Sequence, residues 1–270
     1  MRRAPGTEIP GTRHTSSLPA GSRLWLFLCL VIVLMISARL AYTPRVTAAS
    51  RNQTEILDAV EKAEKDREAR LLGYSVHESY ALFRRGDRDP SAVMDVATTY
   101  IKDKGKSYQV VGESGSRTGR FVLKKILQNE EQLSQGQHRA DVLITSRNYD
   151  MSVPDSLVHE LYGRNCLVVQ IKPKRSSPYL LDGKIWVDAT NYHVVRVEGT
   201  ATAAAALGLS GRPMVERDYA EVNGFPVAIH ARSVSSQMLL GETVVEIKYE
   251  NYKLNFLGEG AHRVVTSPSK

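Results

Sequence analysis

The sequence is poor in cysteine and tryptophan and has no nucleotide-binding motif. Its 270 residues include two cysteines and two tryptophans. Cys29 lies in an apolar N-terminal run, so Cys166 is the single cysteine of the remaining chain, and an intrachain disulfide is excluded there. The sequence contains neither a Walker loop nor a glycine-rich dinucleotide fingerprint. It therefore predicts no cofactor.

Motifs of hydrolytic enzymes are incomplete. The stretch HELYG begins like the helix of a zinc protease, but Gly163 stands where the second histidine is required. Serines near glycines in GESGSRTG and LGLSG lack the spacing of a nucleophile elbow. The histidines are scattered over predicted strands and loops, as His77, His138, His193 and His230 show. These absences predict no metal site, no catalytic residue and a protein that is not an enzyme.

The positive net charge is concentrated near the N-terminus. The whole chain carries +7, but residues 1–49 hold six arginines and one acid. The remaining residues carry 30 basic and 28 acidic side chains, a net charge of +2. A nearly neutral domain gives no electrostatic reason to expect a nucleic-acid partner.

An uncharged and almost wholly apolar run extends from Leu24 to Ala38. It is short for a membrane-spanning helix of about 20 residues, and somewhat long for the core of a signal peptide. Because flanking positive charge stays on the cytoplasmic side, we expect everything after Ala38 to be exported, into the periplasm or another extracytoplasmic space. Cleavage after Ala48 or Ala49 and retention as an inner-membrane anchor are both open. Residues 1–49 are thus predicted to be a signal peptide or signal anchor.

Two helices are predicted after the leader. The first covers residues 52–71, with a capping box of Ser50 and Gln53 at its start and Gly73 as its stop. Its apolar stripe is narrow, which favours packing on a sheet over burial in a bundle. The second is expected from about residue 120 to 135 and closes on Gly136.

The rest of the chain alternates with a period of two, typical of strands. The first three, in YSVHESYALF, AVMDVATTYI and KSYQVVGE, are joined by short turns and predict an antiparallel meander. About ten or eleven strands are expected in all. Such a sheet curls, and its concave apolar face requires a cover, for which only the two helices are available. The prediction is an α+β domain over residues 50–257, an incomplete antiparallel β-barrel with helices across its concave face, followed by a flexible tail at 258–270.

The stretch DGKIWVDATNYHVVRVEG brings two acids, a histidine and an arginine close together in sequence. Its pattern predicts a hairpin with Ile185 and Val187 on one face, Trp186 on the other, and a turn at 188–192. Charged residues at alternate positions are typical of the solvated face of a half-buried strand. We therefore expect scaffold here and no convergent catalytic group.

Longer stretches carry a family resemblance. VVQIKPKRSSPYLLDGKIWVDATNYHVVRVEG resembles the core signature of the LolA-like superfamily of periplasmic lipoprotein and lipid carriers. ERDYAEVNGFPVAIHARSVSS and VEIKYENYKLN are similar to the last strands of exported outer-membrane lipoprotein-sorting proteins. The resemblance spans roughly Asn52 to Leu254 and implies a half-barrel of about eleven strands, with a helical lid and a hydrophobic cavity for acyl chains. The arginine-proline strand pattern of dedicated lipoprotein carriers is absent, and YIKDKGKSYQV stands in its place.

These observations lead to a binding function. The main hypothesis is an extracytoplasmic carrier of lipid or lipoprotein acyl chains, with membrane donor and acceptor proteins as its partners. Four helix residues are expected to point into the cavity: Ile56, Val60, Ile126 and Leu133. The alternative is a membrane-anchored envelope-stress sensor that uses the same half-barrel. A hydrolytic enzyme is the third hypothesis and lacks a catalytic constellation in the sequence.

Overall fold

The computed structural model describes residues 52–84, 86–155, 157–204, 211–237 and 241–258. The predicted leader, its apolar run and all but the first residue of the predicted tail lie outside these ranges. Two compact units divide the chain, and the first, Met1–Thr47, lies wholly outside the described residues. The fold below concerns the second unit alone.

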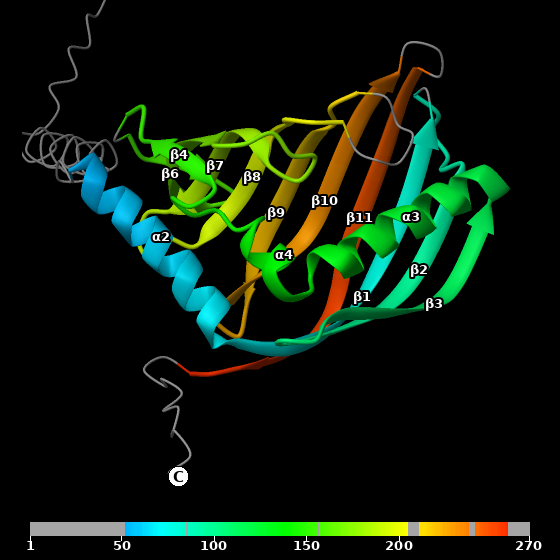
Figure 1. The fold of residues 1–270 in the computed structure, drawn as a ribbon, viewed down its shortest axis with the longest axis horizontal. Coiled ribbons are helices and arrows are strands. Elements are labelled where there is room, and N and C mark those ends of the chain that lie inside the picture. The colour runs from blue at the N-terminus through cyan, green and yellow to red at the C-terminus, as the bar shows by residue number, and fades with distance from the viewer. Residues whose placement is uncertain (1–51, 85, 156, 205–210, 238–240, 259–270) are drawn as a thin grey trace, which may run out of the picture. The chain divides into compact units, whose positions relative to one another are not determined.

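One antiparallel sheet of eleven strands forms this unit (Figure 1). The spatial order is β3-β2-β1-β11-β10-β9-β8-β7-β6-β4, with β5 paired to β6 beside this path. The strands are β1 (Leu71–Arg84), β2 (Ala92–Ile101), β3 (Gly105–Gly115), β4 (Tyr149–Ser152), β5 (His159–Leu161), β6 (Arg164–Pro173), β7 (Leu181–Asp188), β8 (Val194–Ala201), β9 (Met214–Val222), β10 (Phe225–Gln237) and β11 (Gly241–Phe256). Because β3 and β4 end the path, the sheet stays open. The first three strands form the predicted meander.

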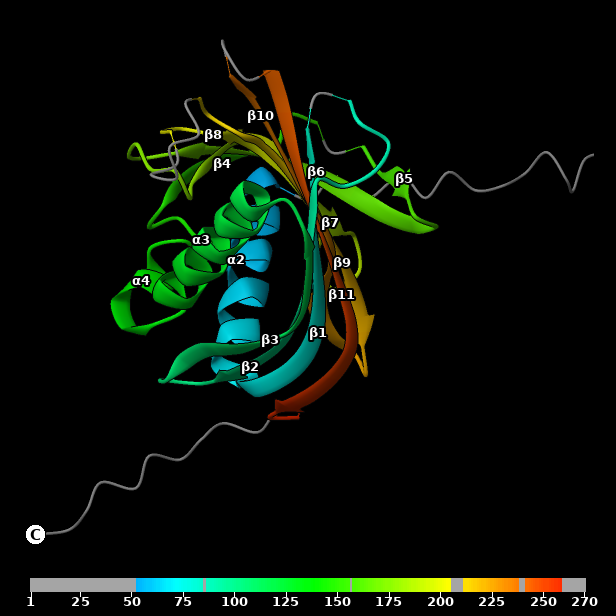
Figure 2. The ribbon, with the colours of Figure 1, turned by 90° about the vertical axis from the view of Figure 1, so that its right-hand side faces the viewer.

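Three helices cover one face of the sheet: α2 (Gln53–Arg70), α3 (Arg117–Leu133) and α4 (Gly136–Ala140). Figure 2 shows the strands curving around them, so the covered face is the concave one. The predicted fold class is therefore confirmed. It is an α+β, incomplete antiparallel barrel of eleven strands with helices over its concave face.

Two separate apolar clusters attach the two long helices to the sheet. Leu123 and Leu127 of α3 pack on β1, β2, β10 and β11, where Tyr80 and Met94 are fully buried. Ile56 and Val60 of α2 pack with residues of β4, β6, β7 and β8. The concave face thus has an α3 half and an α2 half, and β9 runs between them.

The start and end of α2 differ in detail from the prediction. The side chain of Asn52 caps the helix by accepting from the backbone N–H of Thr54 at 3.3 Å. Of the predicted capping box, Gln53 is the first helical residue and Ser50 lies outside the described residues. The helix ends because Leu71 turns to extended backbone and enters β1 directly. Gly73 lies inside β1, where a Cβ would stand 2.7 Å from the carbonyl oxygen of Tyr100. This glycine permits the close approach of β2 and does not stop the helix.

Helix α3 begins earlier than predicted, and a predicted strand after it is mostly absent. Ser116 caps α3 by accepting from the N–H of Gly119 at 3.1 Å. The stretch ADVLITSRNYDMSV forms a strand only over β4, after the short helix α4. Its first part folds into turns because the Asn148 side chain donates to the carbonyls of Ala140 and Leu143, at 2.9 and 2.8 Å.

The β7–β8 hairpin has the predicted faces. Ile185 and Val187 are fully buried in the α2 half of the core, and Trp186 lies on the opposite face. The polar residues of the hairpin divide between two clusters. Arg164 lies 3.8 Å from both Asp188 and Glu221, and His193 contacts Glu221 at 3.1 Å. Glu198 lies elsewhere, paired with Lys184 and Arg196. The scaffold role of this stretch stays a prediction.

Candidate functional site

Charged side chains lie buried on the concave face beneath α3. Along β1 the inward positions are held by Tyr74, Val76, Glu78, Tyr80 and Leu82, and the Glu78 residue is 1% exposed. The sequence-based prediction made this stretch a strand and did not single out Glu78. The signal was present, because a carboxylate stood in the apolar register of a period-two strand.

Glu78 belongs to a cluster that joins the sheet to α3. The hydroxyl of Tyr80 donates to Glu78 Oε2 at 2.5 Å. The ammonium of Lys106, on β3, donates to Glu130 of α3 at 2.8 Å and lies 3.7 Å from Glu78 Oε1. Lys106 and Glu130 are about one-fifth exposed, so the pair is largely shielded from water. An ion pair as well as apolar contacts therefore fastens the C-terminal half of α3.

The pKa values of the two carboxylates in the cluster are shifted in opposite directions. Burial raises the pKa of Glu78, and the charge of Lys106 only partly opposes this effect. Burial acts in the same direction on Glu130, but the charges of Lys106 and Arg217 outweigh it and lower the pKa of Glu130. Paired carboxylates with separated pKa values are typical of acid–base sites. Glu78 is nevertheless enclosed between sheet and helix, so a substrate could reach it only if α3 moved.

The predicted cavity residues lie on both helices but not around one cavity. Ile56 and Val60 are each 1% exposed. Val60 also borders a pocket of about 30 Å³ between α2 and β8–β9, which is the space of one or two water molecules. Ile126 is partly buried at the edge of the α3 cluster, whose centre is Leu123 and Leu127. Their role toward a ligand stays a prediction.

Leu133 borders a larger pocket at the end of α3. This pocket has a volume of about 250 Å³ and lies between α3, α4 and the loop from β6 to β7. Its apolar lining includes Val142, Pro178 and Tyr179. The volume is just below the roughly 300–1,000 Å³ of ordinary ligand pockets. Among the four predicted residues, Leu133 is the one placed at a space of that order.

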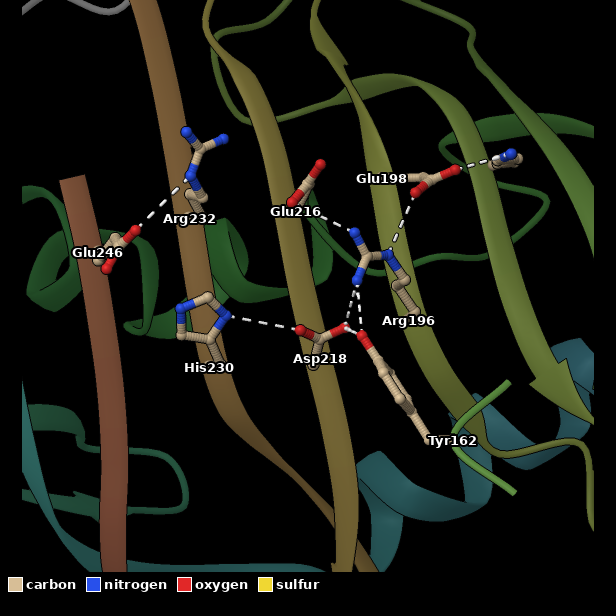
Figure 3. A network of polar contacts seen from close by, with 9 residues as sticks. Tyr162, Arg196, Glu198, Glu216, Asp218, His230, Arg232 and Glu246 are labelled. Atoms are coloured by element: carbon tan, nitrogen blue, oxygen red, sulfur yellow. Dashed lines mark hydrogen bonds and ion pairs between the residues drawn. The ribbon is translucent and has the colours of Figure 1, made fainter. Parts of the chain in front are cut away.

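A second polar network lies on the convex face, away from the helices (Figure 3). Arg196 of β8 is its centre, with contacts to Glu198 at 3.1 Å, Glu216 at 3.2 Å and Asp218 at 3.0 Å. It also donates to the hydroxyl of Tyr162, on the β5–β6 hairpin, at 2.8 Å. The network links β8 and β9 to the hairpin, and its charges lie on the solvated face as predicted.

Replacing Arg196 with methionine should lower the free energy of unfolding by about 1–2 kcal/mol, because three carboxylates lose a shared cation. Added salt should reduce this loss by screening the repulsion. Arg232→Met is the matched control, since Arg232 has a single ion pair, to Glu246 at 3.6 Å, and should cost less than about 0.5 kcal/mol. Urea unfolding at low and high salt measures both variants, and equal losses would contradict the central role of Arg196.

Metal-ligating side chains are dispersed within the described ranges. There, no group of three or more histidine, cysteine, aspartate or glutamate side chains is placed to hold a metal ion. His159 of the HELYG stretch lies in β5, and its ring contacts Trp186 edge-on at 5.8 Å. In the same ranges, no helix has both the length and the apolar character needed to cross a membrane.

Comparisons with known proteins find similarity in fold. No protein-family model matches the sequence, and no curated protein matches it. A LolA superfamily protein from Nitrosomonas europaea is 9% identical, with 78% of this chain and 96% of that chain covered and a TM-score of 0.40. The chain is similar to a structure of the LolA superfamily. This is the family that the strand pattern resembles.

Two further solved structures are similar over comparable lengths. A DUF1329 family protein from Desulfovibrio piger is 11% identical, with 77% of this chain and 94% of that chain covered and a TM-score of 0.40. A domain proposed to be an outer membrane lipoprotein-sorting protein, from Vibrio parahaemolyticus, is 12% identical, with 78% and 96% covered and a TM-score of 0.44. These likenesses concern the arrangement of the sheet and helices.

Proposed function

We propose that the protein is an extracytoplasmic binding protein without catalytic activity. It holds acyl chains of a lipid or lipoprotein between the concave face of the sheet and the helices α2 and α3. The observation that carries this proposal is the attachment of α2. This 18-residue helix covers half of the apolar concave face, yet its buried residues are Ile56 and Val60.

The two ends of α2 are held differently. Near its C-terminal end, Glu68 accepts from Arg139 of α4 at 2.8 Å, and the Arg139 guanidinium stacks 4.4 Å from the ring centre of Tyr100. Toward its N-terminal end, Ile56, Leu57 and Val60 pack on the sheet. Glu61, near the middle of the helix, accepts from the backbone N–H and the hydroxyl of Ser146 at 3.2 and 2.9 Å. The geometry therefore favours a helix that swings away from the sheet about its C-terminal end.

The free energy of burying an acyl chain is large enough to compensate for such an opening. Removing two aliphatic side chains from a core costs about 1.5–3 kcal/mol each. A 16-carbon acyl chain gains on the order of 12 kcal/mol when it is fully buried, at about 0.8 kcal/mol per methylene. A bound chain would thus more than compensate for the lost contacts of α2. The pocket beside Leu133, at about 250 Å³, offers a first point of entry.

Localisation and partners follow from the same function. The basic leader and the apolar run of the sequence support export, and the site of action would be the periplasm or another extracytoplasmic space. A carrier of lipoproteins would receive its cargo from one membrane complex and deliver it to another, as in outer-membrane lipoprotein sorting. These partners would contact the helices, because the helices cover the concave face.

Lipid extraction and mass spectrometry of the purified protein test the proposal directly, with acyl lipids as the expected result. Val60→Asp and Ile126→Asp place a charge under each helix and should lower the retained lipid several-fold, while binding of an apolar dye rises. Val111→Asp is the matched control, because Val111 of β3 is 56% exposed and should change neither readout. Protein that never carries or takes up acyl chains would refute the function.

A further inference from the structure

Arg217 stands at the boundary between the two apolar halves of the concave face. On the neighbouring strands its partners are Val197 of β8 and Ala231 of β10. Val197 belongs to the α2 half of the core and Ala231 to the α3 half. An arginine thus extends from the centre of the sheet toward the helices, with an apolar surface on each side.

The charge of Arg217 lacks a direct counter-ion. Within the described residues its guanidinium forms no ion pair with a carboxylate, and its Nε is buried without a hydrogen-bond partner. Its side chain hydrogen-bonds Tyr219, and Glu130 lies within electrostatic range. The other cations nearby have carboxylate partners. Arg67 pairs with Glu64 at 2.9 Å, and Lys106 pairs with Glu130 at 2.8 Å. A buried charge is costly unless an opposite charge and hydrogen bonds satisfy it. Arg217 is therefore a cation at the centre of the sheet whose nearest negative charge, on Glu130, already pairs with Lys106.

Other polar groups lie on the same face. Oε1 of Glu78 and Oγ1 of Thr98 are also buried there, and these two side chains interact with each other. Burial raises the pKa of Glu78 above its ordinary value. Tyr249, opposite Glu78 on β11, is buried and lies within electrostatic range of Arg217. The centre of the concave face is thus polar and lies between two apolar halves.

We propose that Arg217 binds the anionic group of an amphiphilic ligand, a carboxylate or a phosphate, whose acyl chain lies against one of the adjoining apolar halves. This inference rests on the proposed function and specifies its ligand class. The guanidinium suits both groups because its planar fork matches two oxygens of either one. A neutral amphiphile would leave the same cation buried and unpaired.

Three ligands with the same 16-carbon chain test this inference: hexadecanoate, hexadecyl phosphate and hexadecanol. Their affinities for the full-length protein are measured by displacement of a neutral apolar dye. Hexadecanoate, hexadecyl phosphate or both should bind at least about 10-fold more tightly than hexadecanol, a difference of about 1.4 kcal/mol. Whichever anion shows the preference identifies the headgroup chemistry.

Arg217→Met should remove this preference and leave hexadecanol affinity unchanged, since methionine fits between Val197 and Ala231. Arg217→Lys should keep part of the preference for the anionic ligands. It serves as a control for misfolding of Arg217→Met. Arg196→Lys, on the convex face, should keep all of the preference. Equal affinity for all three ligands in the unaltered protein, or a preference that survives in Arg217→Met, would overturn the inference while the proposed function stands. Failure of all three ligands to displace the dye would overturn both.

Discussion

Replacing Lys106 with methionine should lower the free energy of unfolding by about 3–5 kcal/mol at neutral pH, the range seen when one partner of a buried ion pair is removed. Without its ammonium, Glu78 and Glu130 face each other beneath α3 with no cation between them. For a domain of this size, the expected fall in melting temperature is roughly 10 °C. Thermal and urea unfolding measure the change.

A matched control and a double variant sharpen this test. Lys62→Met removes an exposed ion pair of α2, whose lysine side chain is 78% exposed, and should cost less than about 0.5 kcal/mol. Adding Glu130→Gln to Lys106→Met should recover part of the loss, because it removes one of the two carboxylates that lost their partner. A Lys106→Met protein as stable as the Lys62→Met control would show that the buried pair contributes nothing to stability.

Glu78→Gln should flatten the decline of stability with rising pH. Because burial raises the pKa of Glu78, the folded protein holds a proton that the unfolded chain releases above the ordinary glutamate pKa of about 4.3. The contribution of Glu78 is therefore full below that pH and is lost as the pH rises through the folded pKa. The slope for one proton is at most about 1.4 kcal/mol per pH unit.

Several charged and titratable groups face Glu78, so the difference between variant and parent is the informative quantity. They are Tyr80 of β1, Lys106 of β3, Glu130 of α3 and Tyr249 of β11. Glu130 contributes in the opposite sense, because its pKa is lowered and its stabilisation is lost as the pH falls. Glutamine keeps an acceptor for the Tyr80 hydroxyl. Urea unfolding from pH 4 to 8 should show the two curves diverging as pH rises, and parallel curves would rule out a raised pKa at Glu78.

Much of the fold could be predicted from periodicity, because each alternating stretch was compatible with a strand that buries one of its faces. Ile185, Trp186 and Val187 alternate in the sequence and alternate between the faces of β7. The first three strands also formed their meander, since their connectors are too short for any other arrangement. What was missed depended on tertiary contacts. The side chain of Asn148 holds the preceding apolar stretch in turns, and no local propensity reveals that.

The buried cluster was harder to predict than the fold. Glu78, Lys106 and Arg217 occupy inward positions on three strands that are distant in sequence, and each one alone resembles an ordinary surface charge. Glu130 lies in a helix rich in polar residues, where nothing distinguishes it from Glu131. Their proximity follows from the strand order, and above all from β11, which places β1 beside β10.

The position of β11 also determines the order of folding. Along the described path of the sheet, β1–β3 join the remaining strands through β11, which pairs Phe256 with Leu71. Pairing between the first and last strands has a high contact order, so loop closure makes it slow. Until it forms, β1 exposes an unpaired edge to other chains. We therefore expect the chain to be most prone to aggregation before its last strand joins its first.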